Sequence, residues 1–403
     1  MRPFLHNPVA YNPDMFSERT NWTLAPNRLT QAIDDARTSG ATILDLTVSN
    51  PTRVGLHYEA ESILSAVGSP QALDYDPQPK GLRAARESVA EYYRSHEISH
   101  LDAERIILTT STSEGYSYVF RLLANPGDEV LVPKPTYPLF EFLADLQDVK
   151  LVPYPLIYDH GWQIDLHSLA KAVRARTRGV VLVNPNNPTG SYVQHDELRA
   201  LNALCRERGL ALIVDEVFLD YALAAEPVMS FAANEDCLTF TLSGLSKISA
   251  LPQMKVAWIV TTGQRGEVAA AMARLEIIAD TYLSMNAPVQ WALPTLLEQR
   301  RGIQPQLLNR VQANLAELDR QLTAQKNCER LRVEGGWYAV LRVPVTQSDE
   351  DLAIELLRRE SVLVHPGHFY DFPSDGYLVL SLIAGEKDFA EGIGRVLRMV
   401  NAA

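Results

Sequence analysis

The chain has 403 residues, of which 46% are hydrophobic and 21% are charged, an ordinary composition for a globular protein. Its formal net charge of -12 at pH 7 repels phosphate backbones, so we expect no nucleic-acid partner. Three cysteines without CxxC spacing argue against a disulfide framework or a zinc site, and no apolar run is long enough to span a membrane. Because the N-terminus also lacks the apolar stretch of a signal peptide, the sequence predicts a cytoplasmic protein.

The first part of the chain contains one clear helix pattern, Leu29–Ser39, which Gly40 ends. Helical patterns such as Ser113–Leu123 and Asp196–Arg208 then alternate with short apolar runs. Continuous apolar runs suit strands that are buried on both faces, so we expect a mostly parallel, seven-stranded sheet in a doubly wound α/β domain. The expected strands are Ile106–Thr109, Glu129–Val132, Lys150–Tyr154, Val180–Val183, Ala211–Val214, Leu238–Leu242 and Val256–Val260.

The pattern changes after the last of these strands. Long helices are expected from about Gly266 to Gln325, with interruptions near Ser284–Pro288 and Gly302. A second, smaller α/β block follows, with expected elements at Leu331–Val343, Glu350–Arg359, Val362–His365, Tyr377–Leu382 and Asp388–Val400. The predicted organisation is a large domain over residues 46–290 and a smaller α/β domain that combines residues 1–45 with residues 291–403.

Polar motifs follow the ends of three successive strands. They are Asn184-Pro-Asn-Asn187-Pro-Thr-Gly190, Asp215-Glu216 and Ser243-Gly-Leu-Ser246-Lys247. Each has a simpler explanation when taken alone, because Asn-Pro-Gly runs form turns, an Asp caps helices and a Ser-Lys pair often lies on the surface. Open α/β sheets bind ligands at the carboxyl ends of their strands, so the three motifs together predict a binding site there.

These motifs resemble those of the fold-type-I enzymes that depend on pyridoxal phosphate (PLP), and among them the aspartate aminotransferase-like class I/II aminotransferases. The likeness runs from about Asp45 to the C-terminus. It implies that Lys247 carries the cofactor as a Schiff base, that Asp215 pairs with the pyridine nitrogen, and that Asn187 hydrogen-bonds the phenolic oxygen of the ring. The implied activity is transfer of an amino group from an amino acid, or a related amine, to a 2-oxo acid.

The chemistry of such a reaction explains why these residue types are needed. A buried carboxylate keeps the pyridine nitrogen protonated, so that the ring accepts the electrons of the broken Cα–H bond. A lysine can bind the cofactor covalently and, once displaced by substrate, is a free amine that can move the proton. Lys247 and Asp215 are therefore the expected catalytic residues.

The resemblance also implies the remaining contacts to the cofactor. Tyr137, in a segment typical of the family, would stack on the ring, and Tyr75 would reach the phosphate of a neighbouring subunit, which predicts a homodimer. The hydroxyl-rich start of a helix suits a phosphate, although it is also an ordinary helix cap. The expected phosphate-binding residues are Ser111, Thr112, Ser113, Ser243, Ser246 and Lys255.

Four positions depart from the family pattern. Lys255 replaces an arginine, which keeps the charge but loses the bidentate geometry. Phe218 replaces a tyrosine that binds the phenolic oxygen, so the cofactor linkage is expected to titrate at higher pH than usual. Gly244 stands at a usual serine position, with Ser243 one place earlier, which removes or relocates one phosphate contact. Val379 replaces the arginine that grips the α-carboxylate of the substrate.

The loss of that arginine leaves the substrate end of the site open. Arg53 is the first candidate to replace it, and His365 and His368 are weaker candidates. Trp22 and Trp337 either line the substrate side or belong to the core. The sequence does not identify the donor, the acceptor or the pathway.

Two other functions are compatible with parts of the pattern. A carbon–sulfur β-lyase or a decarboxylase would use the same scaffold, because the way in which substrate is held about Cα decides the reaction. A non-catalytic sensor module of a transcription regulator is disfavoured by the acidic charge and by the expectation of only about 45 residues before the large domain. An aminotransferase remains the leading prediction.

Overall fold

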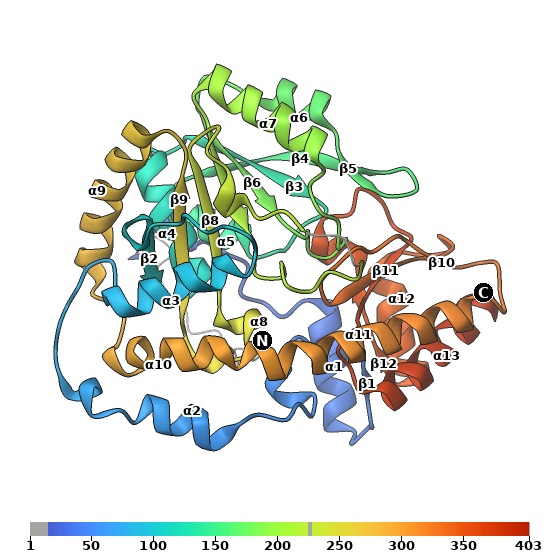
Figure 1. The fold of residues 1–403 in the computed structure, drawn as a ribbon. Helices are drawn as coiled ribbons and strands as arrows, with labels where there is room; N and C mark the ends of the chain where they lie inside the picture. Colours follow the sequence, from blue (N-terminus) through green and yellow to red (C-terminus); the bar gives the residue numbers. More distant parts are fainter. Residues whose placement is uncertain (1–14, 225–227, 403) are drawn as a thin grey trace.

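The computed structural model describes residues 15–224 and 228–402. Residues 1–14 lie outside the described residues. They include the start of the proposed small domain and the segment on which the expectation about a signal peptide rests. Figure 1 shows one large sheet with helices on both sides, and a second lobe formed by the C-terminal part of the chain. None of the described helices combines the length and the apolar composition that crossing a bilayer requires.

The large sheet has eight strands within the described part of the chain, and all seven predicted strands belong to it. Pairing is parallel from β8 through β7, β6 and β3 to β4, whereas β9 and β5 run antiparallel to their neighbours. The additional strand, β5, has only three residues at the edge of the sheet, too few to give a sequence pattern. In spatial order the strands are β2 (Ile106–Thr109), β9 (Ala257–Thr262), β8 (Thr239–Gly244), β7 (Ala211–Asp215), β6 (Thr177–Val183), β3 (Glu129–Lys134), β4 (Lys150–Tyr158) and β5 (Trp162–Ile164).

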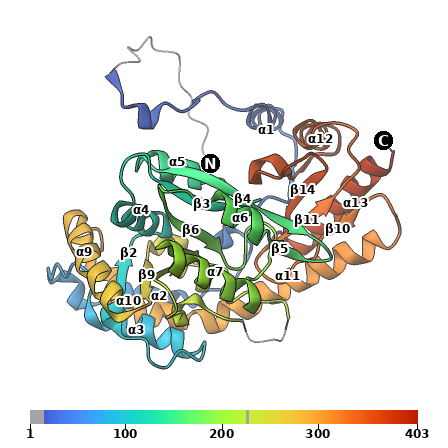
Figure 2. The ribbon, with the colours of Figure 1, turned by 90° about the horizontal axis from the view of Figure 1, so that it is seen from above.

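Helices cover both faces of this sheet because alternate apolar side chains of each strand point to opposite sides. Val181 and Val183 of β6 pack in one cluster with α4 and α9, whereas Val180 and Leu182 pack in another with α6 and α7. Figure 2 shows α6 and α7 on the side of the sheet away from α5. The helices of this part are α2 (Ala60–Val67), α3 (Arg83–Arg94), α4 (Thr112–Leu123), α5 (Phe140–Asp145), α6 (Leu166–Ala172), α7 (His195–Arg208), α8 (Leu245–Ile248) and α9 (Arg265–Tyr282).

Two helices, α10 (Ala287–Glu298) and α11 (Arg300–Leu322), run end to end from the large sheet to the C-terminal lobe (Figure 1). The break predicted near Ser284–Pro288 is present between α9 and α10. The second break was predicted near Gly302 but lies at Gln299, and Gly302 is inside α11. A side chain added at Gly302 would meet nothing within 4 Å, so this glycine marks an open helix surface rather than a turn.

The C-terminal lobe is built on a four-stranded sheet with the order β10–β11–β14–β13, in which every pairing is antiparallel. A short parallel pair, β1 with β12, ties the segment after α1 to this lobe. The proposed boundary between large and small domains stays a prediction. The elements of this part are α1 (Arg28–Thr38), β1 (Leu44–Asp45), β10 (Glu329–Arg330), β11 (Tyr338–Arg342), α12 (Asp349–Glu355), a π-helical turn (Leu356–Glu360), β12 (Val362–Leu363), β13 (His365–Pro366), β14 (Tyr377–Ser381) and α13 (Glu386–Ala402).

Candidate active site

One cavity of about 590 Å³ lies at the carboxyl ends of the parallel strands. Asn187 follows β6, Asp215 ends β7, and Lys247 lies on α8 directly after β8. All three side chains line this cavity, so the fold brings together residues that are 28 and 32 positions apart in the sequence. The opposite wall comes from the C-terminal lobe and includes Tyr338 and His365.

Lys247 is enclosed by rings and held through its backbone. Its Nζ lies 4.7 Å from the centroid of the Trp337 ring and 5.4 Å from that of Phe218. The Tyr221 hydroxyl donates a 2.6 Å hydrogen bond to the Lys247 carbonyl, which fixes the short helix α8. Burial lowers the pKa of the Lys247 amine to about 8, although the charge of Asp215 acts in the opposite direction. At this pKa about a tenth of the amine is unprotonated and nucleophilic at pH 7.

Asp215 is a half-buried carboxylate that lines the cavity and has few partners. The Val217 N–H donates to it at 3.0 Å and the Tyr116 hydroxyl at 3.3 Å. Burial raises the pKa of Asp215 to about 6, while these two donors and the charge of Lys247 lower it. A carboxylate in such surroundings favours a cationic partner in the cavity, as a protonated pyridine nitrogen would be.

Asn187 supplies an unfilled hydrogen-bonding position. Its Oδ1 atom is buried and has no hydrogen-bond partner among the described residues. Buried polar atoms are nearly always paired, so an unpaired one in a cavity wall indicates a group that binds there. A cofactor with a polar ring substituent and a ring nitrogen, such as PLP, therefore fits the combination of Asn187, Asp215 and Lys247.

The start of α4 forms the hydroxyl-rich end of the cavity. Ser111 is the N-cap of this helix, and its Oγ accepts a hydrogen bond from the Glu114 N–H at 3.2 Å. Ser111, Thr112 and Ser113 all line the cavity, as Ser246 does. Helix N-termini present free N–H groups and a partial positive charge, which suits a phosphate. The cap and the phosphate interpretations are thus compatible at this position.

Two predicted phosphate contacts lie elsewhere. Ser243 is buried, and its hydroxyl donates to the Glu216 carbonyl at 3.3 Å instead of lining the cavity. Lys255 is exposed and does not line the cavity either. Gly244 does line it, and a Cβ there would come within 2.8 Å of the Val256 carbonyl oxygen and the Ala257 Cβ. The chain therefore passes β9 too closely at residue 244 for the serine that is usual in the family.

Of the four aromatic candidates, two line the cavity and two do not. Tyr137 and Phe218 line the cavity, as expected for a stacking ring and for the residue that replaces a tyrosine. Trp337 is fully buried against Phe218, with ring centroids 5.1 Å apart. Trp22 lies outside the cavity, where its Nε1–H donates to Asp145 at 2.8 Å.

The candidate substitutes for the missing arginine are also separated by the structure. Val379 is buried in the core of the C-terminal lobe. Arg53 and His368 are exposed and do not line the cavity, whereas His365 does. Sequence reasoning overlooked Tyr116, which follows the hydroxyl-rich start of α4 and contacts Asp215. It also overlooked Tyr338 and Tyr370, which line the cavity from the C-terminal lobe, where no motif marks them.

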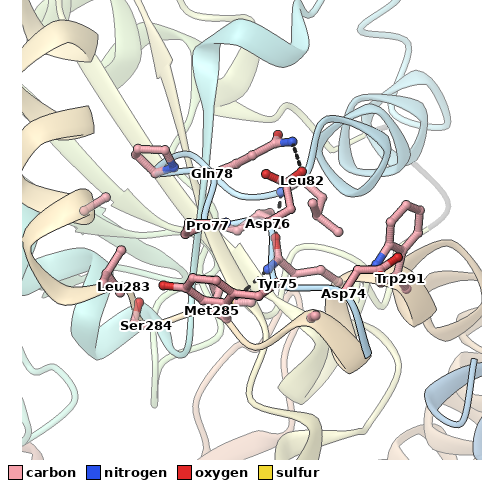
Figure 3. A pocket seen from close by; sticks show the side chains of 15 residues that line it. Asp74, Tyr75, Asp76, Pro77, Gln78, Leu82, Leu283, Ser284, Met285 and Trp291 are labelled. Atoms are coloured by element: carbon pink, nitrogen blue, oxygen red, sulfur yellow. Dashed lines mark hydrogen bonds between the residues drawn. The ribbon is translucent and has the colours of Figure 1, made fainter. Parts of the chain in front are cut away.

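Tyr75 lies on a separate surface, which is shown in Figure 3. Its side chain is 81% exposed in the single chain and borders a pocket together with Leu283, Met285 and Trp291. Polar residues such as Asp74, Asp76 and Gln78 border the same pocket, and exposed apolar side chains gathered inside a polar rim are typical of an interface. Tyr75 does not line the cavity of its own chain.

Known proteins of similar sequence and fold agree with this geometry. The family model described as "Aminotransferase class I and II" matches residues 41–382. The glutamate-pyruvate aminotransferase AlaA of Haemophilus influenzae is 28% identical over 371 residues, which cover 90% of this chain and 91% of that protein. The alanine aminotransferase of Mycobacterium tuberculosis is 27% identical over 367 residues, with 89% and 85% covered.

Solved structures show the same fold at lower identity. The alanine aminotransferase from Pyrococcus furiosus superimposes with a TM-score of 0.84 at 19% identity, covering 93% of this chain and 96% of that one. The aspartate aminotransferase of Thermus thermophilus with maleate gives 0.81 at 22% identity, with 95% and 99% covered. The predicted fold type is confirmed, and the β-lyase and decarboxylase alternatives are not favoured because the related proteins are aminotransferases. The chain belongs to the class I and II aminotransferase family and is a PLP-dependent aminotransferase.

Proposed function

We propose that Lys247 both anchors PLP in the cavity and moves the proton at the Cα atom of the substrate. When bound, the cofactor supplies an electron sink for the Cα–H electrons. The observation that carries the proposal is the convergence of Lys247, Asp215 and Asn187 on one cavity. The rings of Phe218 and Trp337 beside the Lys247 amine keep its pKa near 8 by excluding water, which leaves it able to accept and return a proton at neutral pH.

Each wall residue then has one task in holding the cofactor. Asp215 would pair with the pyridine nitrogen, whose positive charge lowers the pKa of the carboxyl from its value in the cavity. Asn187 would hydrogen-bond the phenolic oxygen, and Tyr137 would stack on the ring. Ser111, Thr112, Ser113 and Ser246 would bind the phosphate with the N-terminus of α4. Ser243 and Lys255 are left out of this proposal because neither lines the cavity.

The amino donors proposed for the first trials are L-alanine and L-glutamate, with pyruvate as acceptor. The support is that relatives sharing most of their length with this chain are glutamate-pyruvate and alanine aminotransferases. The cavity volume of about 590 Å³ is sufficient for the cofactor together with a small substrate.

We further propose a cytoplasmic homodimer in which Tyr75 reaches the site of the partner subunit. The exposed Tyr75, Leu283 and Trp291 form an apolar surface that a second copy would cover. The described cysteines are free and buried, which suits a reducing compartment. Sedimentation of the purified protein should give the mass of two chains, and Tyr75→Ala should weaken retention of PLP; a monomer that retains PLP fully would contradict the dimer.

The test of the activity is a visible spectrum of the PLP-loaded enzyme. Addition of L-alanine or L-glutamate should convert the yellow band into the pyridoxamine band, and pyruvate should restore it. Lys247→Ala should lack the covalent band altogether. A wild type whose band no donor converts, or a Lys247→Ala variant with an unchanged band, would contradict the proposed roles.

A further inference from the structure

The substrate wall of the cavity lacks the cation that would hold a carboxylate. Among the described residues that line the cavity, Lys247 is the one lysine or arginine, and its amine is committed to the cofactor and the proton. The hydrogen-bonding groups contributed by the C-terminal lobe are His365, Tyr338 and Tyr370. A carboxylate that entered this end of the cavity would therefore have to be bound by neutral donors or remain unpaired, which is costly.

His365 lies directly beside the position of the missing arginine in the sheet. β13 pairs antiparallel with β14, and His365 lies directly opposite Val379 in the register. Side chains of directly opposed residues project from the same face of a sheet. The His365 side chain thus projects from the same face of the sheet as the side chain at position 379, and it lines the cavity whereas Val379 is fully buried.

A hydrogen bond orients the imidazole. His365 Nδ1 lies 3.1 Å from the Tyr370 hydroxyl, and the two rings are 5.8 Å apart. Burial lowers the pKa of His365 to about 4, against the influence of Asp45, and burial holds the pKa of Tyr370 well above its usual value. Both groups are consequently neutral at pH 7. In the tautomer that carries its hydrogen on Nε2, Nδ1 accepts from the Tyr370 hydroxyl and Nε2 is free to donate.

The other two candidates are less suitable. Arg53 ends a short 3-10 helix, Pro51–Arg53, and its side chain is exposed outside the cavity. His368 is exposed and packs edge-on against Phe369, with ring centroids 4.7 Å apart. Neither contributes to the cavity wall of its own chain.

We propose that His365, oriented by Tyr370, is the specificity-determining residue that donates a hydrogen bond to the substrate α-carboxylate in place of the arginine. This inference rests on the proposed function, because it concerns the substrate end of the same site. A neutral donor binds a carboxylate less tightly than a bidentate guanidinium. The enzyme should consequently discriminate only moderately between an amino acid and the amine that lacks its carboxylate.

The test compares two unreactive probes on the PLP-loaded enzyme. 2-Methylalanine carries a carboxylate and tert-butylamine carries a methyl group in its place, and neither has a Cα–H bond to break. Their dissociation constants are measured from the change in the visible band. His365→Phe should weaken binding of 2-methylalanine about 10- to 100-fold, the range for a lost hydrogen bond to a charged group, and should change tert-butylamine by less than about twofold.

Further variants keep the result interpretable. His365→Gln retains a hydrogen-bond donor and should keep most of the affinity for 2-methylalanine. This variant also tests the proposal if His365→Phe binds PLP poorly. Arg53→Gln and His368→Gln should leave both constants unchanged. Equal effects of His365→Phe on the two probes, or a selective loss of 2-methylalanine binding in Arg53→Gln, would overturn the assignment. Failure of the proposed function is distinct, because it would appear as a wild type that no amino acid converts to the pyridoxamine form.

Discussion

The two walls of the cavity differ in how closely they follow the family pattern. The wall made by the ends of β6, β7 and β8 carries Asn187, Asp215 and Lys247 at the expected places. The wall made by the C-terminal lobe has a core valine where an arginine was expected, and it exposes His365 and Tyr370 to the cavity instead. The cofactor wall thus keeps its three central polar groups although it departs from the family pattern at Phe218 and Gly244, whereas the substrate wall has lost its charged contact.

The strongest test of the cofactor wall is Lys247→Ala. We expect a fall in the transamination rate of at least about 10⁴-fold, because the same residue supplies the covalent link and the proton transfer. Because the variant lacks the covalent band, the rate is measured in both proteins as pyruvate formed from L-alanine in a single turnover with added PLP. Lys171→Ala, at an exposed position of α6, is the matched control and should keep the wild-type rate. If Lys247→Ala kept a rate comparable to that of the wild type, Lys247 would not be the residue that links the cofactor and moves the proton.

Asp215→Asn should have the next largest effect. An amide cannot stabilise a protonated pyridine nitrogen, so the rate should fall about 100-fold or more while the fold is retained. Tyr116→Phe removes only one hydrogen bond to the same carboxylate and should lower the rate less than about tenfold. If Asp215→Asn proved harmless, this carboxylate would be structural and not part of the cofactor site.

Glu216 directly follows Asp215 in the sequence, and its substitution tests whether this second carboxylate also belongs to the cofactor wall. It is fully buried, accepts hydrogen bonds from the Ser230 hydroxyl and the Phe231 N–H, and burial raises its pKa from 4.5 to about 7. The pKa of Glu216 is higher in the folded state than in the unfolded state. Protonated Glu216 therefore makes its full contribution to the free energy of unfolding below pH 4.5, and this contribution is lost as the pH rises through 7. Glu216→Gln should therefore remove this pH dependence, which is worth about 1–3 kcal/mol.

The measurement is urea unfolding of the apo-protein at pH 5 and pH 8, with the wild type losing more stability over this interval than the variant. Equal losses in both proteins would show that Glu216 does not bind this proton. The rate of the PLP-loaded enzyme at pH 7 should change little, because the Glu216 side chain does not line the cavity.

The smallest expected effect concerns Phe218, where the cofactor wall itself departs from the family pattern. Phe218→Tyr introduces a hydroxyl beside the cavity, and a hydrogen bond to the phenolic oxygen should lower the pH midpoint of the visible band by up to about one unit. The titration is followed at the wavelength of the yellow band. An unchanged midpoint would mean that the new hydroxyl does not reach the cofactor, and that Asn187 alone interacts with this oxygen.

Most of the cofactor wall could be predicted because its residues follow directly from the ends of strands. A parallel sheet places the carboxyl ends of neighbouring strands side by side, so motifs 28 and 32 residues apart must meet. Ser243 shows the limit of this reasoning. It stands next to Gly244 in the sequence, yet its side chain points to the Glu216 carbonyl and away from the cavity. In an extended strand, a shift of one residue reverses the direction of the side chain.

The sequence by itself determined the mostly parallel α/β sheet and the strands that carry the site, because the local hydrophobic pattern encodes them. The strand-end motifs identified Lys247, Asp215 and Asn187, which line the cavity. Only the tertiary structure gave the choice of which candidate lines the cavity, because His365 does so whereas Arg53 and His368 lie outside it. That choice depends on the register of β13 against β14 and on the packing of the C-terminal lobe over the sheet, which are contacts between residues distant in sequence. No local pattern records such contacts, because hydrophobic periodicity specifies which face of an element is buried and not which element covers it.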